Sequence, residues 1–157
     1  MYLWIDPWIR KLGYALIKPD LLIEDAGILL LDKKKPTRTD NFHKIYEIQQ
    51  FFEKIIKNYD IKNICIEKLF FTNKNQANAE FVFGVRAVLS VLFIKNNISF
   101  CEYAPVHIKK YITGNGSANK DLVQRFVMNI FNLESIPEYH DAADALALAY
   151  IASFKKK

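Results

Sequence analysis

The chain has 157 residues, of which 51% are hydrophobic and 25% are charged. This composition excludes a disordered chain, and we expect a single domain over residues 1–157. A formal net charge of +5 favours a polyanionic partner such as nucleic acid. No apolar stretch approaches the roughly 18 residues that span a membrane, and the first residues lack the pattern of a secretion signal. We therefore expect a cytoplasmic protein with no membrane partner.

Periodic apolar residues between turn-forming residues predict the elements of an α/β fold. In chain order these are strands at 2–6, 12–19 and 22–32, a helix at 41–59, a strand at 61–67, a helix at 77–96, a strand at 98–105, and helices at 105–113, 118–131 and 142–154. Asp40 or Asn41 is expected to cap the first helix, and Ser117 the fourth. The order predicts a mixed five-stranded sheet flanked by helices. Cys65 and Cys101 lie in strand-like runs, too far apart in sequence for a metal or redox motif, and we expect reduced core residues.

Acidic residues stand at the ends of predicted elements. Asp6 ends the first strand, and Glu67 ends the fourth. Asp141 and Asp144 begin the last helix, and their spacing puts their Cβ atoms on one face, about 5–6 Å apart. If the two strands are neighbours and the helix begins across their ends, these carboxylates converge. Such a cluster repels itself unless cations such as Mg²⁺ or Mn²⁺ neutralise it.

A carboxylate cluster of this kind can hold two cations about 3.5–4 Å apart, which suits phosphodiester cleavage. Each acid taken alone has an ordinary structural explanation. Asp141 can cap the last helix and Asp144 can be a solvated acid of its first turn, which the helix dipole favours. The combination of the acids, in this order and with these separations, is what favours a metal site.

The acids belong to longer stretches that follow one another along the chain. These are IDPWIRKLGYALI, CIEKLFFTNKNQANAEFVFGVRAVL, EYAPVHIKKYITGNGSANKDLVQRFV and HDAADALALA. Together they resemble the RuvC family of Holliday junction resolvases over nearly the whole chain. The resemblance implies an RNase H-like fold, a homodimer, and paired symmetric nicks in four-way DNA junctions during recombination and repair. It also implies the branch-migration proteins RuvA and RuvB as partners.

The resemblance assigns roles to individual residues. It implies that the catalytic residues and metal ligands are Asp6, Glu67, Asp141 and Asp144, which would hold two Mg²⁺ ions, with Mn²⁺ as a substitute. It further implies DNA contacts by Phe70, Lys109 and Lys120, the first by stacking on bases and the lysines near the scissile phosphate. From the bare sequence, Phe70 could equally pack in the core, and the lysines could be ordinary surface residues. His140 is a second-rank candidate, as a general base, an extra ligand or a solvated residue at the helix start.

The predicted helix at 77–96 is apolar on almost every side between Phe81 and Ile94. Such a helix must be buried on two faces. One face can meet the sheet and the other a second subunit, which would suit a substrate with near two-fold symmetry. A fully buried central helix is the alternative.

One position departs from the family pattern. A glycine usually follows Asp-Pro in the first acidic turn, whereas this chain has Trp8. A bulky residue does not take a positive φ cheaply. Either the turn therefore has a different shape, or the indole faces solvent or DNA.

Three other functions are open at this stage. An RNase H-like relative of the YqgF type would act on RNA. A junction-binding protein without catalysis would result if Trp8 spoils the metal site, and its binding would depend steeply on salt. A sugar-kinase-like fold shares the strand, acid and turn, but the chain lacks the glycine-rich phosphate loop that such a protein needs.

Overall fold

The computed structural model describes residues 1–31, 35–69, 79–133, 146–147 and 150–151. Its strands are β1 (Tyr2–Asp6), β2 (Lys11–Ile17), β3 (Ile23–Leu30), β4 (Asn63–Glu67) and β5 (Ser99–Tyr103). Its helices are α1 (Arg38–Asn58), α2 (Ala79–Lys95), α3 (Pro105–Thr113) and α4 (Lys120–Ile130). Residues 146–147 and 150–151 are also helical, within the predicted last helix. The predicted order of elements is confirmed.

The strands form one sheet in the order β3-β2-β1-β4-β5. The chain builds β1, β2 and β3 as an antiparallel meander, and β4 and β5 then extend the sheet in parallel with β1. The prediction of a mixed five-stranded sheet is therefore confirmed. Because β1, β4 and β5 are parallel, their carboxyl ends lie at the same edge of the sheet.

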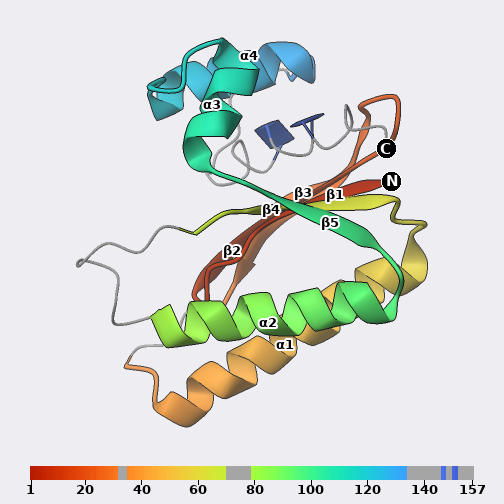
Figure 1. Ribbon diagram of the computed structural model, residues 1–157, viewed down its shortest axis with the longest axis vertical. Helices are drawn as coiled ribbons and strands as arrows, with labels where there is room; N and C mark the ends of the chain where they lie inside the picture. Colours follow the sequence, from red (N-terminus) through yellow and green to blue (C-terminus); the bar gives the residue numbers. More distant parts are fainter. Residues whose placement is uncertain (32–34, 70–78, 134–145, 148–149, 152–157) are drawn as a thin grey trace.

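Helices cover both faces of this sheet, as Figure 1 shows, with α1 and α2 on one side and α3 and α4 on the other. Side chains alternate between the faces along β1. Leu3 and Ile5 join the core under α1 and α2, which we call the first core cluster. Trp4 joins the core on the opposite face with residues of α3 and α4, which we call the second core cluster. Both clusters contain side chains that are fully buried.

Two helix caps differ from the sequence predictions. Thr37, and not Asp40 or Asn41, caps α1: its side chain accepts a hydrogen bond from the backbone N–H of Asp40, and the Asp40 carboxylate accepts one from the backbone N–H of Thr37. This reciprocal pair is a capping box, with Asp40 as the third helical residue. Asn119, and not Ser117, caps α4 by accepting a hydrogen bond from the N–H of Leu122 at 2.9 Å. Within the described part of the chain, no helix has the length and hydropathy to cross a membrane.

Candidate active site

Asp6 and Glu67 lie side by side at the edge where the parallel strands end. The register pairs Ile5 of β1 with Ile66 of β4, and each acid is the next residue along its strand. Neighbouring strands are about 4.8 Å apart, so the two Cα atoms are close neighbours. Asp6 is buried, with 9% of its surface exposed, and Glu67 is half-buried. The structure therefore brings together two of the four predicted acids.

Both acids belong to the face of the sheet that carries α3 and α4. Trp4 and Cys65 lie two residues before Asp6 and Glu67, and both pack in the second core cluster. Alternation along a strand then directs the two acids to the same face. Leu146 and Ala147 of the last helix also belong to this cluster, as does Ile151. The helix that follows the other two predicted acids therefore packs against the same face of the sheet.

Four of the predicted site residues lie outside the described residues. They are Phe70, His140, Asp141 and Asp144. Among the residues that the structure does describe, no three histidine, cysteine or acidic side chains form a metal-binding group. Asp6 and Glu67 nevertheless offer the chemistry that Mg²⁺ prefers, since both are carboxylates and neighbours at one sheet edge. The donor set thus fits a hard divalent cation.

The turn after Asp6 has a shape that a bulky residue can adopt. The N–H of Trp8 donates to the carbonyl of Asp6 at 3.0 Å, which closes a three-residue turn centred on Pro7. Trp8 is not among the described residues with positive φ, so its side chain imposes no backbone strain. The indole is partly buried against the first core cluster. Of the two possibilities that the sequence left open, the different turn shape is the one that the structure supports.

The end of β4 is fixed on both sides of Glu67. The N–H of Lys68 donates to the carbonyl of Tyr103 on β5 at 2.8 Å. Arg86 of α2 donates from Nη1 to the carbonyl of Glu67 at 2.8 Å, and its Nη2 pairs with Glu102 of β5. Burial lowers the pKa of Arg86, but a guanidinium stays charged in proteins. Arg86 could not be predicted as a site residue from the sequence, because nothing in the apolar pattern of the helix indicates a partner on a strand end.

The predicted DNA-contacting lysines lie on the two helices that cover the same face of the sheet as the acids. Lys109 is half-buried on α3, and Lys120 is exposed as the first residue of α4. The α3 helix begins at Pro105, directly after β5 ends at the carboxyl edge of the sheet (Figure 1). Both lysines therefore lie on the same side of the sheet as Asp6 and Glu67.

The two cysteines are neighbours in space, which their separation in sequence concealed. Cys65 and Cys101 are paired in the β4–β5 ladder, and their Sγ atoms are 2.9 Å apart. Both are free thiols, and Cys65 is buried while Cys101 is half-buried. The expectation of reduced core residues fits Cys65 fully and Cys101 in part.

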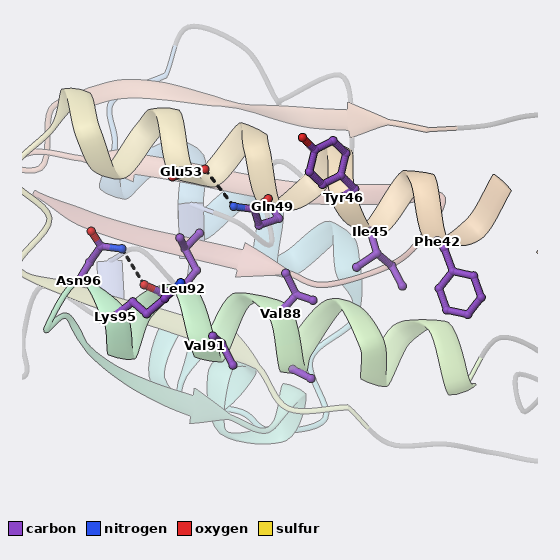
Figure 2. Close-up of a pocket in the computed structure, with 11 residues that line it drawn as sticks. Phe42, Ile45, Tyr46, Gln49, Glu53, Val88, Val91, Leu92, Lys95 and Asn96 are labelled. Carbon is purple, nitrogen blue, oxygen red and sulfur yellow. Dashed lines mark hydrogen bonds between the residues drawn. The ribbon is translucent and has the colours of Figure 1, made fainter. Parts of the chain in front are cut away.

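The outer side of α2 is exposed and apolar. Phe83, Val91 and Ile94 are 55%, 57% and 66% exposed, whereas the other side of the helix packs in the first core cluster. A groove of about 570 Å³ runs between α1 and α2. Figure 2 shows this groove with Phe42 at one end and Asn96 at the other. Within this chain, the alternative of a fully buried central helix is therefore wrong.

Two solved structures of a RuvC protein share this architecture. A structure of Thermus thermophilus RuvC aligns with a TM-score of 0.78 at 23% identity, covering 94% of this chain and 90% of that one. A second, titled as T. thermophilus RuvC in complex with a Holliday junction substrate, aligns with a TM-score of 0.79 at 20% identity, covering 95% and 90%. These similarities identify the fold as RNase H-like.

Sequence comparison identifies the family. The family model described as "Crossover junction endodeoxyribonuclease RuvC" matches residues 2–152. Curated proteins of that name are 36% identical in Brachyspira hyodysenteriae, over 94% of this chain and 89% of the relative, and 31% identical in Caldanaerobacter subterraneus, over 94% and 88%. The chain belongs to the RuvC family of crossover junction endodeoxyribonucleases.

Proposed function

We propose that this chain resolves four-way DNA junctions by paired symmetric nicks, in the cytoplasm, during recombination and repair. The observation that carries the proposal is the placement of Asp6 and Glu67 at the carboxyl ends of adjacent parallel strands, in a chain that belongs to a nuclease family. The family match favours this reaction over the RNA-directed alternative. The turn at Trp8 keeps Asp6 buried at the strand end, which argues against a decayed site.

The proposed catalytic groups are Asp6, Glu67, Asp141 and Asp144, which would hold two Mg²⁺ ions. When bound there, the ions would supply the Lewis-acid chemistry that phosphodiester cleavage needs. The protein contributes a fixed donor geometry: β1 and β4 set the spacing of the first two acids, and the sheet–helix packing of the second core cluster supports the last helix. Asp6 is buried at the end of β1, which limits the access of solvent to this residue.

The DNA would approach on the face that carries α3 and α4. We propose that Lys109 and Lys120 contact phosphates near the cut and that Phe70 stacks on junction bases. The supporting observation is that both lysines lie on the helices covering the acids' side of the sheet. Phosphate contacts would position the junction, while its shape would give selectivity over duplex DNA. RuvA and RuvB are proposed partners through the family alone, and His140 stays a second-rank site residue.

A homodimer would present two such sites to one junction. The proposed interface is the exposed outer side of α2 together with the groove that it forms with α1. A patch of large apolar side chains on a helix is expected to be covered in solution. A two-fold axis would place two active sites symmetrically, which matches paired nicks in a substrate with near two-fold symmetry.

Substitution of the acids tests the proposed chemistry. Asp6→Asn and Glu67→Gln keep the size of each side chain and remove its charge. We expect both variants to lose Mg²⁺-dependent cleavage of a synthetic four-way junction by at least about 100-fold, since each removes a proposed metal ligand. Junction binding measured in EDTA should be unchanged within a factor of about 3. Normal cleavage by either variant would contradict the assignment of that acid.

A further inference from the structure

Arg86 reaches the end of β4 from the face of the sheet opposite to the proposed catalytic acids. Its Nη1 donates to the carbonyl oxygen of Glu67 at 2.8 Å, and its Nη2 pairs with Glu102. Glu102 is the register partner of Ile66, which packs in the first core cluster under α2. One guanidinium therefore ties β4, β5 and α2 together at the last residue of β4.

This contact is sheltered from solvent. The side chain of Arg86 is 14% exposed, and the hydrogen bond to Glu67 is part-buried. A hydrogen bond from a charged donor in such surroundings is stronger than one at the surface. Glu67 is the last residue of β4. A hydrogen bond to its carbonyl oxygen restrains the peptide plane next to its Cα atom, and the Glu67 side chain extends from that Cα atom toward the other face of the sheet.

We propose that Arg86 is a positioning residue for the carboxylate of Glu67, an inference that rests on the proposed metal-dependent nuclease function. Arg86 approaches the sheet from α2, on the face opposite to the one where we propose that DNA binds. Its hydrogen bond adds a second restraint at the last residue of β4, besides the bond from the Lys68 N–H to Tyr103 of β5. Groups that orient a metal ligand typically change metal affinity or activity by about 10- to 100-fold when they are removed.

The planar fork of arginine is needed for this role. It presents N–H groups in fixed directions, so one end can meet the carboxylate of Glu102 while the other meets a carbonyl. A lysine keeps the charge for Glu102 but offers a single ammonium on a flexible chain. Arg86→Lys should therefore retain the link to β5 and lose the hold on Glu67.

The chain offers a matched control in Arg38. Both of its terminal nitrogens contact Glu80, so Arg38, like Arg86, forms an arginine–glutamate ion pair that involves α2. That pair is exposed, with side chains 64% and 57% accessible. Its contacts link α1 to the first turn of α2, and they do not involve the end of β4. Arg38→Met therefore removes an ion pair of the same kind without altering Glu67.

The experiment compares wild type with Arg86→Met, Arg86→Lys and Arg38→Met. Hydrogen exchange of the Lys68 amide in metal-free protein reports on the strand end, since this N–H bonds to Tyr103. Thermal unfolding during titration with Mg²⁺, without DNA, reports on metal binding. Single-turnover cleavage and junction binding report on the reaction.

We expect both Arg86 variants to exchange the Lys68 amide at least about 10-fold faster and to need about 10-fold more Mg²⁺ for half-maximal stabilisation. Their cleavage should fall by about 10- to 100-fold at limiting Mg²⁺ with junction affinity unchanged. Arg38→Met should match wild type in all of these measurements. Wild-type Mg²⁺ dependence in Arg86→Met, or a loss confined to melting temperature, would overturn the proposal.

Failure of the proposed function has a separate signature. In that case the wild-type protein shows no Mg²⁺-dependent stabilisation and no junction cleavage, whatever the variants do. Faster Lys68 exchange in Arg86→Met with unchanged Mg²⁺ dependence would assign Arg86 to strand stability alone and contradict the positioning role.

Discussion

Truncation of Ile94 tests the proposed dimer surface on α2. This side chain is 66% exposed, near the end of the helix and beside Val91. Ile94→Ser removes apolar surface that a partner subunit would cover. The folded monomer should be little affected, because exposed substitutions of this kind usually change the free energy of unfolding by less than about 0.5 kcal/mol.

The expected loss of dimer stability follows from the exposed area. Burying an isoleucine side chain fully contributes about 1.5–3 kcal/mol, and two-thirds of that is about 1–2 kcal/mol. A two-fold interface contains the residue twice, which gives about 2–4 kcal/mol. At about 1.4 kcal/mol for each factor of ten, the dimer dissociation constant should rise roughly 30- to 700-fold.

Sedimentation velocity over a concentration series measures this constant. Leu30→Ser is the matched control, because Leu30 is also 66% exposed but lies on the edge strand β3. The control should keep the wild-type dissociation constant. Equal dimerisation of wild type and Ile94→Ser, or a weakened dimer in Leu30→Ser alone, would refute the placement of the interface.

A helix cap, a half-buried tyrosine and an exposed lysine give further tests. Thr37→Ala should lower the free energy of unfolding by about 1 kcal/mol in urea titrations because it breaks the capping box, and Thr39→Ala should change it by less than half of that. Burial and the neighbouring Asp25 raise the pKa of Tyr14 to about 12. Between about pH 10 and 12, the folded state therefore keeps a proton on Tyr14 that the unfolded state loses, and the free energy of unfolding should fall as the pH rises. After allowance for solvent screening, the fall should be about 1 kcal/mol larger in wild type than in Tyr14→Phe. Parallel curves of unfolding free energy against pH for the two proteins would contradict this. Lys120→Ala should slow single-turnover cleavage about 10-fold, a larger effect than its loss of junction binding, whereas equal weakening of binding to all DNA shapes with an unchanged cleavage step would make it a general phosphate contact.

The sequence was informative about the edge of the sheet where Asp6 and Glu67 lie. Each acid ends a short apolar strand, and strands of this kind show a pattern that a single sequence reveals. Their proximity requires β1 and β4 to be neighbouring strands, a condition that the sequence left open and that the parallel register meets. The helix caps were less predictable, because several Thr, Asp, Asn and Ser residues precede each helix. The backbone selects one of them, Thr37 for α1 and Asn119 for α4.

Contacts between distant segments were beyond the reach of sequence patterns. The apolar pattern of the helix gives no indication of the partners of Arg86, which lie on two strands. Cys65 and Cys101 likewise became neighbours only through the register of β4 and β5. Both cases depend on tertiary packing, which local spacing does not encode. The sheet–helix packing that gives α2 one buried and one exposed side belongs to the same category.

Cleavage of a labelled synthetic four-way junction is the decisive measurement. Wild-type protein is incubated with the junction and with a linear duplex of the same sequence, in Mg²⁺ and in EDTA. Symmetric nicks in the junction alone, present in Mg²⁺ and absent in EDTA and in Asp6→Asn, are the predicted result. Tight junction binding without any nick, or equal cutting of junction and duplex, would contradict the proposed resolvase.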